Sequence, residues 1–139
     1  MSDYLLDACA VIALLNDEEG AEAVSELLDR AERKEITLNI SAVNLLEVYY
    51  DRIRVVGIER SDAIIQEIYN AFPISVIQTL SPDIVREAAC LKAAGKMSFA
   101  DTILIATARC TGATVVTCDH AELDPVEQQE HISFFWIRP

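Results

Sequence analysis

The sequence of 139 residues has few of the residues that interrupt regular secondary structure. It contains four glycines and four prolines, and no repeat, low-complexity tract or linker divides it. Hydrophobic residues make up 52% of the chain, which excludes a disordered protein. A chain of this length can bury a core of its own, so we expect a single domain over residues 1–139.

Long apolar runs and targeting signals are also missing. The first apolar run, ACAVIALL at 8–15, is too short to span a bilayer. It follows Asp3 and Asp7 with no Lys or Arg ahead of it, which is the reverse of a targeting segment. The sequence therefore predicts a cytoplasmic protein with no membrane partner.

The four cysteines show no C-x-x-C spacing: Cys9, Cys90, Cys110 and Cys118. They lie in apolar surroundings, where a free cysteine behaves as a small hydrophobic residue. Cys118 and His120 alone are too few ligands for a zinc site. We therefore expect neither disulfides nor structural zinc.

Positive charge is scarce, because 11 basic residues stand against 23 acidic ones and the net charge is −12. Non-specific nucleic-acid binding relies on Lys and Arg to neutralise phosphates, so the charge alone argues against it. The same charge suits a soluble acidic protein, a cation-binding protein or a protein with a basic partner. Net charge therefore leaves the function open.

Short apolar segments alternate with helical segments along the chain. Strands are expected at 4–7, 37–40, 74–77, 114–118 and 133–137. A helical stretch after the first strand has acidic residues at 17–19 near its start and basic residues at 30–34 near its end. Further helices are expected from Ser41 to about Val56, Ser61 to Pro73, Ser81 to Gly95 and Ser98 to Gly112. Apolar strands that alternate with helices indicate an α/β sandwich around a parallel sheet.

Several acidic residues are expected at one edge of this sheet, the carboxyl ends of the strands, where ligands of open parallel sheets bind. Asp7 ends the first strand and Asp119 follows the fourth. Either aspartate alone could be a turn or cap residue, but two at matching strand ends indicate a site. The helix at 41–56 carries one polar stripe at helical spacing, consisting of Asn44, Glu47, Asp51 and Arg54. We expect Glu47 near the same edge, and Asp51 and Arg54 in solvent.

The segment SFADTILIATA at 98–108 places Asp101 in an otherwise apolar helix. Ser98 and Asp101 fit the S-x-x-D capping pattern, which satisfies backbone N–H groups at a helix start. A carboxylate on an apolar face needs a partner, because unpaired burial costs several kcal/mol or shifts its pKa. A cation shared with the other acids would provide that partner, so both interpretations of Asp101 remain open.

The sequence resembles the PIN domains, which are metal-dependent ribonucleases, and within them the VapC-type toxins of toxin–antitoxin pairs. The segments that carry this resemblance are YLLDACAVIALL, SAVNLLEVYY, SFADTILIATA, GATVVTCDH and FFWI. It implies a three-layer sandwich with about five parallel strands. It also implies an acidic quartet with catalytic and metal-binding roles, which corresponds to Asp7, Glu47, Asp101 and Asp119. Thr117 corresponds to a supporting hydroxyl residue, whereas Cys9 stands where many members have a small hydroxyl residue.

Carboxylate ligands with few histidines favour Mg²⁺ or Mn²⁺ over zinc. We expect Asp7 and Asp101 to be direct ligands, and Glu47 and Asp119 to act through bound waters or as general base. Two neighbouring polar residues, Ser98 and Asn44, are expected to support them. The resemblance implies an endoribonuclease that acts on single-stranded or looped RNA. The alternative is a catalytically silent metal-binding or protein-interaction domain of the same fold.

Other acidic sites at strand ends fit the sequence less well. Receiver domains have adjacent acids after the first strand and a late lysine, whereas Ala8 follows Asp7 and no lysine follows Lys96. Phosphatases of the D-x-D type need an acid at position 9, which is Cys9. A nucleotide-binding module would need a glycine-rich first turn, and DACAVIA has none.

The expected RNA contacts are the basic residues Arg52, Arg54, Lys92 and Lys96. The resemblance further implies a homodimer and an antitoxin whose tail lies across the acidic pocket. The helix at 41–56 has too narrow a polar stripe for the surface of a monomer. We therefore expect an interface on this helix that includes Val48, Val55, Tyr49 and Tyr50.

Overall fold

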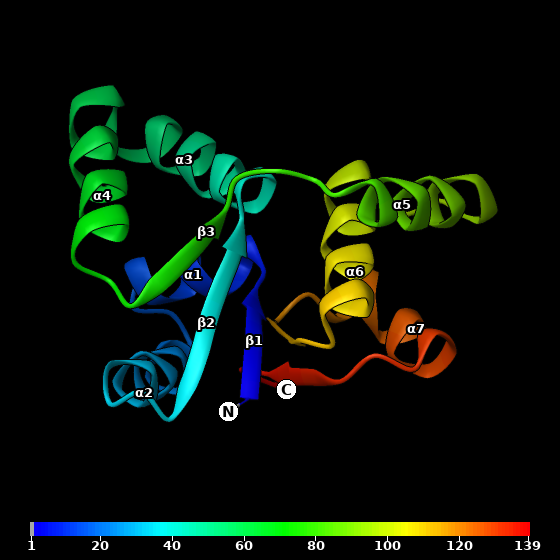
Figure 1. Ribbon diagram of the computed structural model, residues 1–139. Coiled ribbons are helices and arrows are strands. Elements are labelled where there is room, and N and C mark those ends of the chain that lie inside the picture. The colour runs from blue at the N-terminus through cyan, green and yellow to red at the C-terminus, as the bar shows by residue number, and fades with distance from the viewer. Residues whose placement is uncertain (1) are drawn as a thin grey trace.

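Five parallel strands form the centre of the computed structural model, which describes residues 2–139 (Figure 1). The strands are β1 (Ser2–Leu6), β2 (Ile36–Ser41), β3 (Ile74–Ile77), β4 (Thr114–Thr117) and β5 (Phe134–Trp136). Their order in the sheet is β3-β2-β1-β4-β5, and every neighbouring pair is parallel. The predicted α/β architecture with a parallel sheet of about five strands is confirmed.

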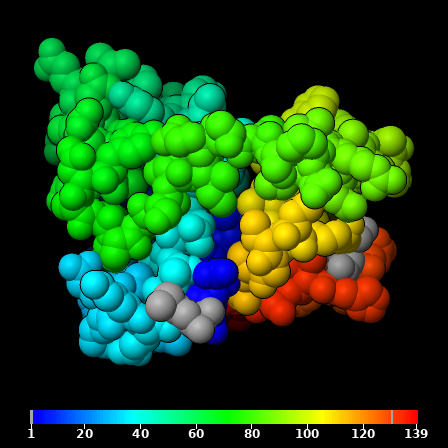
Figure 2. Space-filling view, viewed as in Figure 1, coloured from blue at the N-terminus to red at the C-terminus, as the bar shows by residue number. Residues whose placement is uncertain are grey.

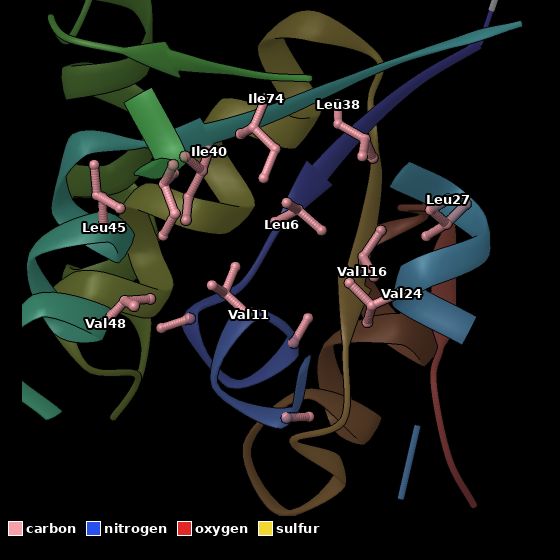
Figure 3. Close-up of a cluster of buried hydrophobic side chains, with 14 of the residues drawn as sticks. Leu6, Val11, Val24, Leu27, Leu38, Ile40, Leu45, Val48, Ile74 and Val116 are labelled. Carbon is pink, nitrogen blue, oxygen red and sulfur yellow. The ribbon is translucent and has the colours of Figure 1, made fainter. Parts of the chain in front are cut away.

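Helices cover the two faces of the sheet, because successive strand residues point to opposite sides. The helices are α1 (Ala8–Leu15), α2 (Ala21–Glu32), α3 (Ala42–Val56), α4 (Ile58–Asn70), α5 (Pro82–Ala94), α6 (Phe99–Thr111) and α7 (His120–Glu130). Leu6 and Val116 pack with side chains of α1 to α4, whereas Leu5 and Val115 pack with α6 and α7. Figure 3 shows the first of these clusters, with Leu6 beside Val11.

The second face is covered less completely over β2 and β3. A hollow of about 270 Å³ lies there between the strands and the end of α6. Its wall includes polar side chains of β2 and β3, namely Thr37, Asn39 and Ser75. Figure 2 shows the blue N-terminal strand at the floor of a hollow between the cyan and green segments and the yellow ones.

The order of the strands reverses between β1 and β4. The chain runs from β1 outward to β2 and β3, and then returns to the other side of β1 to form β4 and β5. Helices therefore leave β1 and β4 toward opposite faces and open a crevice at the carboxyl ends of these strands. Asp7 follows β1 at this point, and its N–H donates to the Val116 carbonyl at 2.9 Å.

Two predicted helix boundaries were wrong. The helical stretch after β1 is divided into α1 and α2, since Gly20 has a φ of +101° that suits glycine, and residues 17–19 lie between the two helices. Helix α4 begins at Ile58 instead of Ser61. Ser61 is buried, and its hydroxyl donates to the Gly57 carbonyl at 2.7 Å.

Helix α7 was not predicted from the sequence. It contains Pro125, and only Leu123 and Val126 of its described side chains are buried, so the apolar spacing gives little helical signal. Within residues 2–139, none of the helices is long and apolar enough to cross a membrane.

Candidate active site

The four predicted acids come from four separate elements and line one pocket of about 420 Å³. Asp7 precedes α1, Glu47 lies in α3, Asp101 is in the first turn of α6, and Asp119 caps α7. The pocket lies at the carboxyl ends of β1 and β4, where the strand order reverses. The fold therefore brings the quartet together at the edge expected from the sequence.

Asp7 is the most tightly held acid of the pocket. Its Oδ1 accepts the Ala8 N–H at 2.8 Å, and its Oδ2 accepts the Thr117 hydroxyl at 2.8 Å. Thr117 is fully buried and its Oγ1 also accepts the N–H of Asp119 at 3.1 Å. One hydroxyl therefore fixes the side chain of one acid and the backbone of another.

Cys9 completes this hydrogen-bonded group. Its Sγ lies 3.6 Å from Asp7 Oδ2 and 3.3 Å from Thr117 Oγ1, and it accepts the Cys118 N–H at 3.2 Å. Burial, followed by the charge of Asp7, raises the pKa of the Cys9 thiol. The thiol therefore stays neutral and can occupy the place of a small hydroxyl residue beside the first acid.

Glu47 is half-buried and is held from one turn earlier on α3. The Asn44 side chain is fully buried, and its Nδ2 donates to Glu47 Oε1 at 2.9 Å. Burial raises the pKa of Glu47, the hydrogen bond from Asn44 opposes the rise, and the charges of Asp7 and Asp119 add to it. Asn44 therefore orients the Glu47 carboxylate.

The helix cap beside Asp101 is provided by Ser98. Ser98 Oγ accepts the Asp101 N–H at 3.1 Å, while the Asp101 carboxyl group lies on the wall of the pocket. Burial, followed by the negative charge of Asp7, raises the pKa of Asp101 to about 6. Capping by Ser98 therefore leaves the Asp101 carboxylate close to other negative charges.

Burial also raises the pKa of Asp7, although the bonds from Thr117, Ala8 and Cys9 oppose the rise and the charge of Asp119 adds to it. Three of the four acids thus have raised pKa values, for a shared reason. Each loses water on folding and faces like charges across the pocket. None of the described residues that line this pocket is a Lys, Arg or His that could neutralise them.

The donor set suits a hydrated cation with oxygen ligands. Among residues 2–139, no three His, Cys, Asp or Glu side chains are arranged to hold a metal ion by themselves. A closed zinc site is therefore a poor fit. Mg²⁺ is commonly held by one or two carboxylates and keeps several waters, which agrees with separated carboxylates around an open pocket. The residues present fit a hydrated divalent cation on these grounds.

The described pocket wall also includes residues that were not predicted to belong to the site: beside Ala8, Cys9 and Ile12 of the first turns after β1, these are Tyr50, Asp51 and Glu122. Asp51 was expected in solvent, but it is half-buried and its Oδ2 lies 2.6 Å from Arg52 Nη2. Glu122 lies in the first turn of α7, three residues after Asp119, and its N–H donates to Asp119 Oδ1 at 3.2 Å. The D-x-x-E order of residues 119–122, directly after a strand, could have indicated Glu122 only if α7 had been recognised.

The four basic residues expected to bind RNA have different surroundings. Arg52 is only 4% exposed and forms an ion pair with Asp51. The prediction that Arg52 contacts RNA at the surface was therefore wrong. Arg54 is exposed and lies over the Tyr50 ring at 5.5 Å. Lys92 donates to the Met97 carbonyl at 2.7 Å, and Lys96 is exposed beside it on the loop before α6.

The predicted interface on α3 also needs a correction. Val48 is fully buried in the core, because it faces inward toward α1 and the sheet, so it cannot contact a partner. Tyr49 is half-buried and its hydroxyl donates to Asp62 of α4. The apolar side chains that α3 does expose are Leu46, Tyr50, Ile53 and Val55.

The histidines take no part in the pocket wall. His131 is exposed. His120 was expected at the surface, but it is half-buried and stacks on Trp136 with ring centroids 3.9 Å apart. Its Nδ1 lies 2.7 Å from Asp124 Oδ1, and its Nε2 lies 2.9 Å from the Arg138 carbonyl. His120 therefore fixes the chain end against α7.

Sequence comparison places this chain in a known family. The family model of the PIN domain matches residues 4–125, so the chain belongs to the PIN domain family. The matched range contains all four acids of the pocket. Comparison of the sequence with curated proteins gives no match.

Several solved structures share the fold over nearly the whole chain. VapBC-1 from nontypeable Haemophilus influenzae has a TM-score of 0.71 and 18% identity, covering 97% of this chain and 98% of that one. VapBC2 from Rickettsia felis, bound to a DNA fragment from its promoter, has a TM-score of 0.72 and 17% identity, covering 96% and 97%. A toxin–antitoxin complex from Klebsiella pneumoniae has a TM-score of 0.62 and 19% identity, covering 86% and 89%. At these identities the likeness establishes the fold.

Proposed function

We propose that the protein is an endoribonuclease that depends on Mg²⁺ or Mn²⁺ and hydrolyses RNA phosphodiester bonds. The observation that carries this proposal is the acidic pocket, where carboxylates from four elements face one another with no basic residue on the described wall. Such a pocket is costly to bury unless a cation occupies it. Membership of the PIN domain family and the likeness to VapBC structures support the same proposal.

Each acid would have a separate role. Asp7 and Asp101 would hold the ion, which supplies an activated water and neutralises charge on the phosphate. Glu47 has a raised pKa and its Oε1 is oriented by Asn44, so it is suited to accept the proton of the attacking water. Asp119 would orient waters from its position at the start of α7. Thr117 would act as a positioning residue, since it bonds both Asp7 and the Asp119 backbone.

The biological role that we infer is the toxin of a type II toxin–antitoxin pair. Two kinds of observation support it: the shared fold with VapBC complexes, and the exposed apolar side chains of α3, namely Leu46, Tyr50, Ile53 and Val55. We propose that this α3 surface takes part in a homodimer and that an antitoxin covers the acidic pocket. A net charge of −12 would favour a basic antitoxin tail.

Metal binding is the direct test of the proposed function. Titration with Mg²⁺ or Mn²⁺ should release or absorb heat and raise the melting temperature, because an ion that binds only the folded state stabilises it. The expected gain is about 2.7 kcal/mol when the free ion reaches 100 times its Kd. Asp7→Asn should lose the response and the cleavage of single-stranded RNA, whereas Glu26→Gln on the exposed side of α2 should keep both. A wild-type protein that binds neither ion at millimolar concentration would refute the nuclease proposal.

A further inference from the structure

Phe99 is the most exposed large hydrophobic side chain among the described residues, with 70% of its surface accessible. It is the first residue of α6 and directly follows Ser98, which lies on the wall of the acidic pocket. Asp101 is only two residues further along the same helical turn. An aromatic ring is therefore presented to solvent at the rim of the proposed active site.

The chain segment that leads to Asp101 carries positive charge and no acid. Residues 88–100 contain Lys92 and Lys96 and no acid, in a chain with 23 acidic and 11 basic residues. The Lys92 ammonium lies 4.9 Å from the centroid of the Phe99 ring and donates to the Met97 carbonyl at 2.7 Å. Lys92 therefore fixes the loop before α6 and places a cation against the ring.

A second pocket continues from this rim toward α7. It has a volume of about 350 Å³ and lies between Lys96 and Met97 on one side and α7 on the other. Glu122 belongs to the wall of this pocket and to that of the acidic pocket, so the two hollows are neighbours. A ligand that extends from the acidic pocket thus has a path past Lys96 and Met97, on the loop that leads to Phe99.

We propose that Phe99, together with Lys92 and Lys96, forms a subsite where an unstacked base of single-stranded RNA stacks beside the scissile phosphate. This inference rests on the proposed nuclease function and adds how the substrate is held. Proteins that bind single strands combine aromatic platforms with basic side chains that follow the phosphates. The rim provides both in a chain whose net charge would otherwise repel RNA.

The chemistry of the rim would also favour single-stranded over duplex RNA. A base in a duplex is already stacked on its neighbours and cannot lie on the Phe99 ring without being unpaired. Lys96 contacts only backbone charge, so its contribution would be the same for both kinds of RNA. Phe99 would therefore set the preference for unpaired RNA, and Lys96 would add affinity without preference.

Binding can be measured separately from cleavage. A labelled oligoribonucleotide is titrated with wild-type protein in EDTA, and fluorescence anisotropy gives the Kd for the single strand, for its duplex and for a base-free ribose-phosphate oligomer. We expect Phe99→Ala to weaken single-strand binding about tenfold, because stacking contributes roughly 1–3 kcal/mol per base. Phe99→Trp should retain the wild-type affinity for the single strand. Both variants should bind the duplex and the base-free oligomer like wild type. Val85→Ala, which shortens an exposed side chain of α5, is the matched control.

Charge is tested in the same way. Lys96→Ala should lower the affinity for the single strand, the duplex and the base-free oligomer by the same factor. It should also reduce the salt dependence of binding by about one phosphate contact. Lys34→Ala removes another exposed charge, from the loop before β2 at the amino ends of the strands, and should have a smaller effect on RNA binding.

Two results would overturn the subsite. Unchanged single-strand affinity in Phe99→Ala, with wild-type RNA binding intact, would remove the stacking role. If Phe99→Ala binds the single strand like wild type but has a different molar mass in light scattering, Phe99 belongs to a protein–protein contact instead. A wild-type protein that binds RNA in this base-dependent manner but cleaves none with Mn²⁺ would refute the nuclease proposal and keep the subsite, so the two failures are distinct.

Discussion

Replacing Asp101 by asparagine should stabilise the metal-free protein while abolishing its activity. Burial and the charge of Asp7 raise the pKa of Asp101 from 3.8 to about 6. That rise corresponds to roughly 3 kcal/mol of unfavourable free energy at neutral pH, at 1.36 kcal/mol per pKa unit. Asparagine is of similar size and carries no charge, so Asp101→Asn should recover up to roughly 3 kcal/mol above the pKa of Asp101.

The sign of the pH dependence follows from the direction of the shift. A raised pKa means that folded Asp101 binds its proton more tightly than unfolded Asp101 between pH 3.8 and about 6. The wild-type protein should therefore lose stability as the pH rises through this window, and the loss should be complete above it. Asp101→Asn lacks this titrating carboxyl group. The gain in unfolding free energy of the variant over wild type should therefore be near zero at the lower end of the window and reach its full value at neutral pH.

Urea unfolding in EDTA at several pH values measures this difference directly. The difference in unfolding free energy between wild type and variant cancels the contributions of distant titratable groups. Glu35 is one of them: Arg33 lowers its pKa, so its contribution to stability grows as the pH rises. Glu26→Gln, an exposed carboxylate on α2, should leave stability nearly unchanged at each pH. A flat difference between wild type and Asp101→Asn across the window would refute the view that the pocket is electrostatically strained without metal.

Two further predictions concern the support of the site and its surroundings. Thr117→Val should cost about 1–3 kcal/mol in urea unfolding, since it removes the partner of the Asp119 N–H and leaves Asp7 Oδ2 with only the weak thiol donor of Cys9. Thr117→Ser should keep most of the stability. Leu46→Asp on the α3 surface should convert a dimer to a monomer in light scattering, whereas Leu80→Asp, another exposed leucine, should not. A monomeric wild type at tens of micromolar would contradict the proposed dimer.

Much of the fold could be predicted because the strands are short, apolar and separated by clear helix signals. The expected range 74–77 for the third strand is identical to β3, and Ser41, Ser81 and Ser98 are the caps of α3, α5 and α6. The sequence could not reveal that Gly57 ends one helix and starts the next without a loop. Its φ of +85° turns the chain in a single residue, which a pattern of caps does not show.

The candidate site was predictable to the extent that it depends on the ends of strands and helices. Asp7 and Asp119 needed only the strand boundaries, but the burial of Val48 and Arg52 depends on how α3 is rotated against α1 and α4. That rotation is set by tertiary packing, and a helix that is apolar on most sides does not specify it. Asp51 was misjudged for the same reason, since the rotation that buries Val48 also places Asp51 on the pocket wall.

Three helix starts meet at the acidic pocket, and this explains how the fold tolerates the acids before any ion binds. Asp7 caps α1, Ser98 caps α6 beside Asp101, and Asp119 caps α7. Helix N-termini favour negative charge, so each of these helices offsets part of the repulsion between the carboxylates. The offset is incomplete, because the pKa values of Asp7 and Asp101 remain raised. The remaining repulsion is what a divalent cation would relieve, and it couples ion binding to stability in the same pocket that would hold the RNA phosphate.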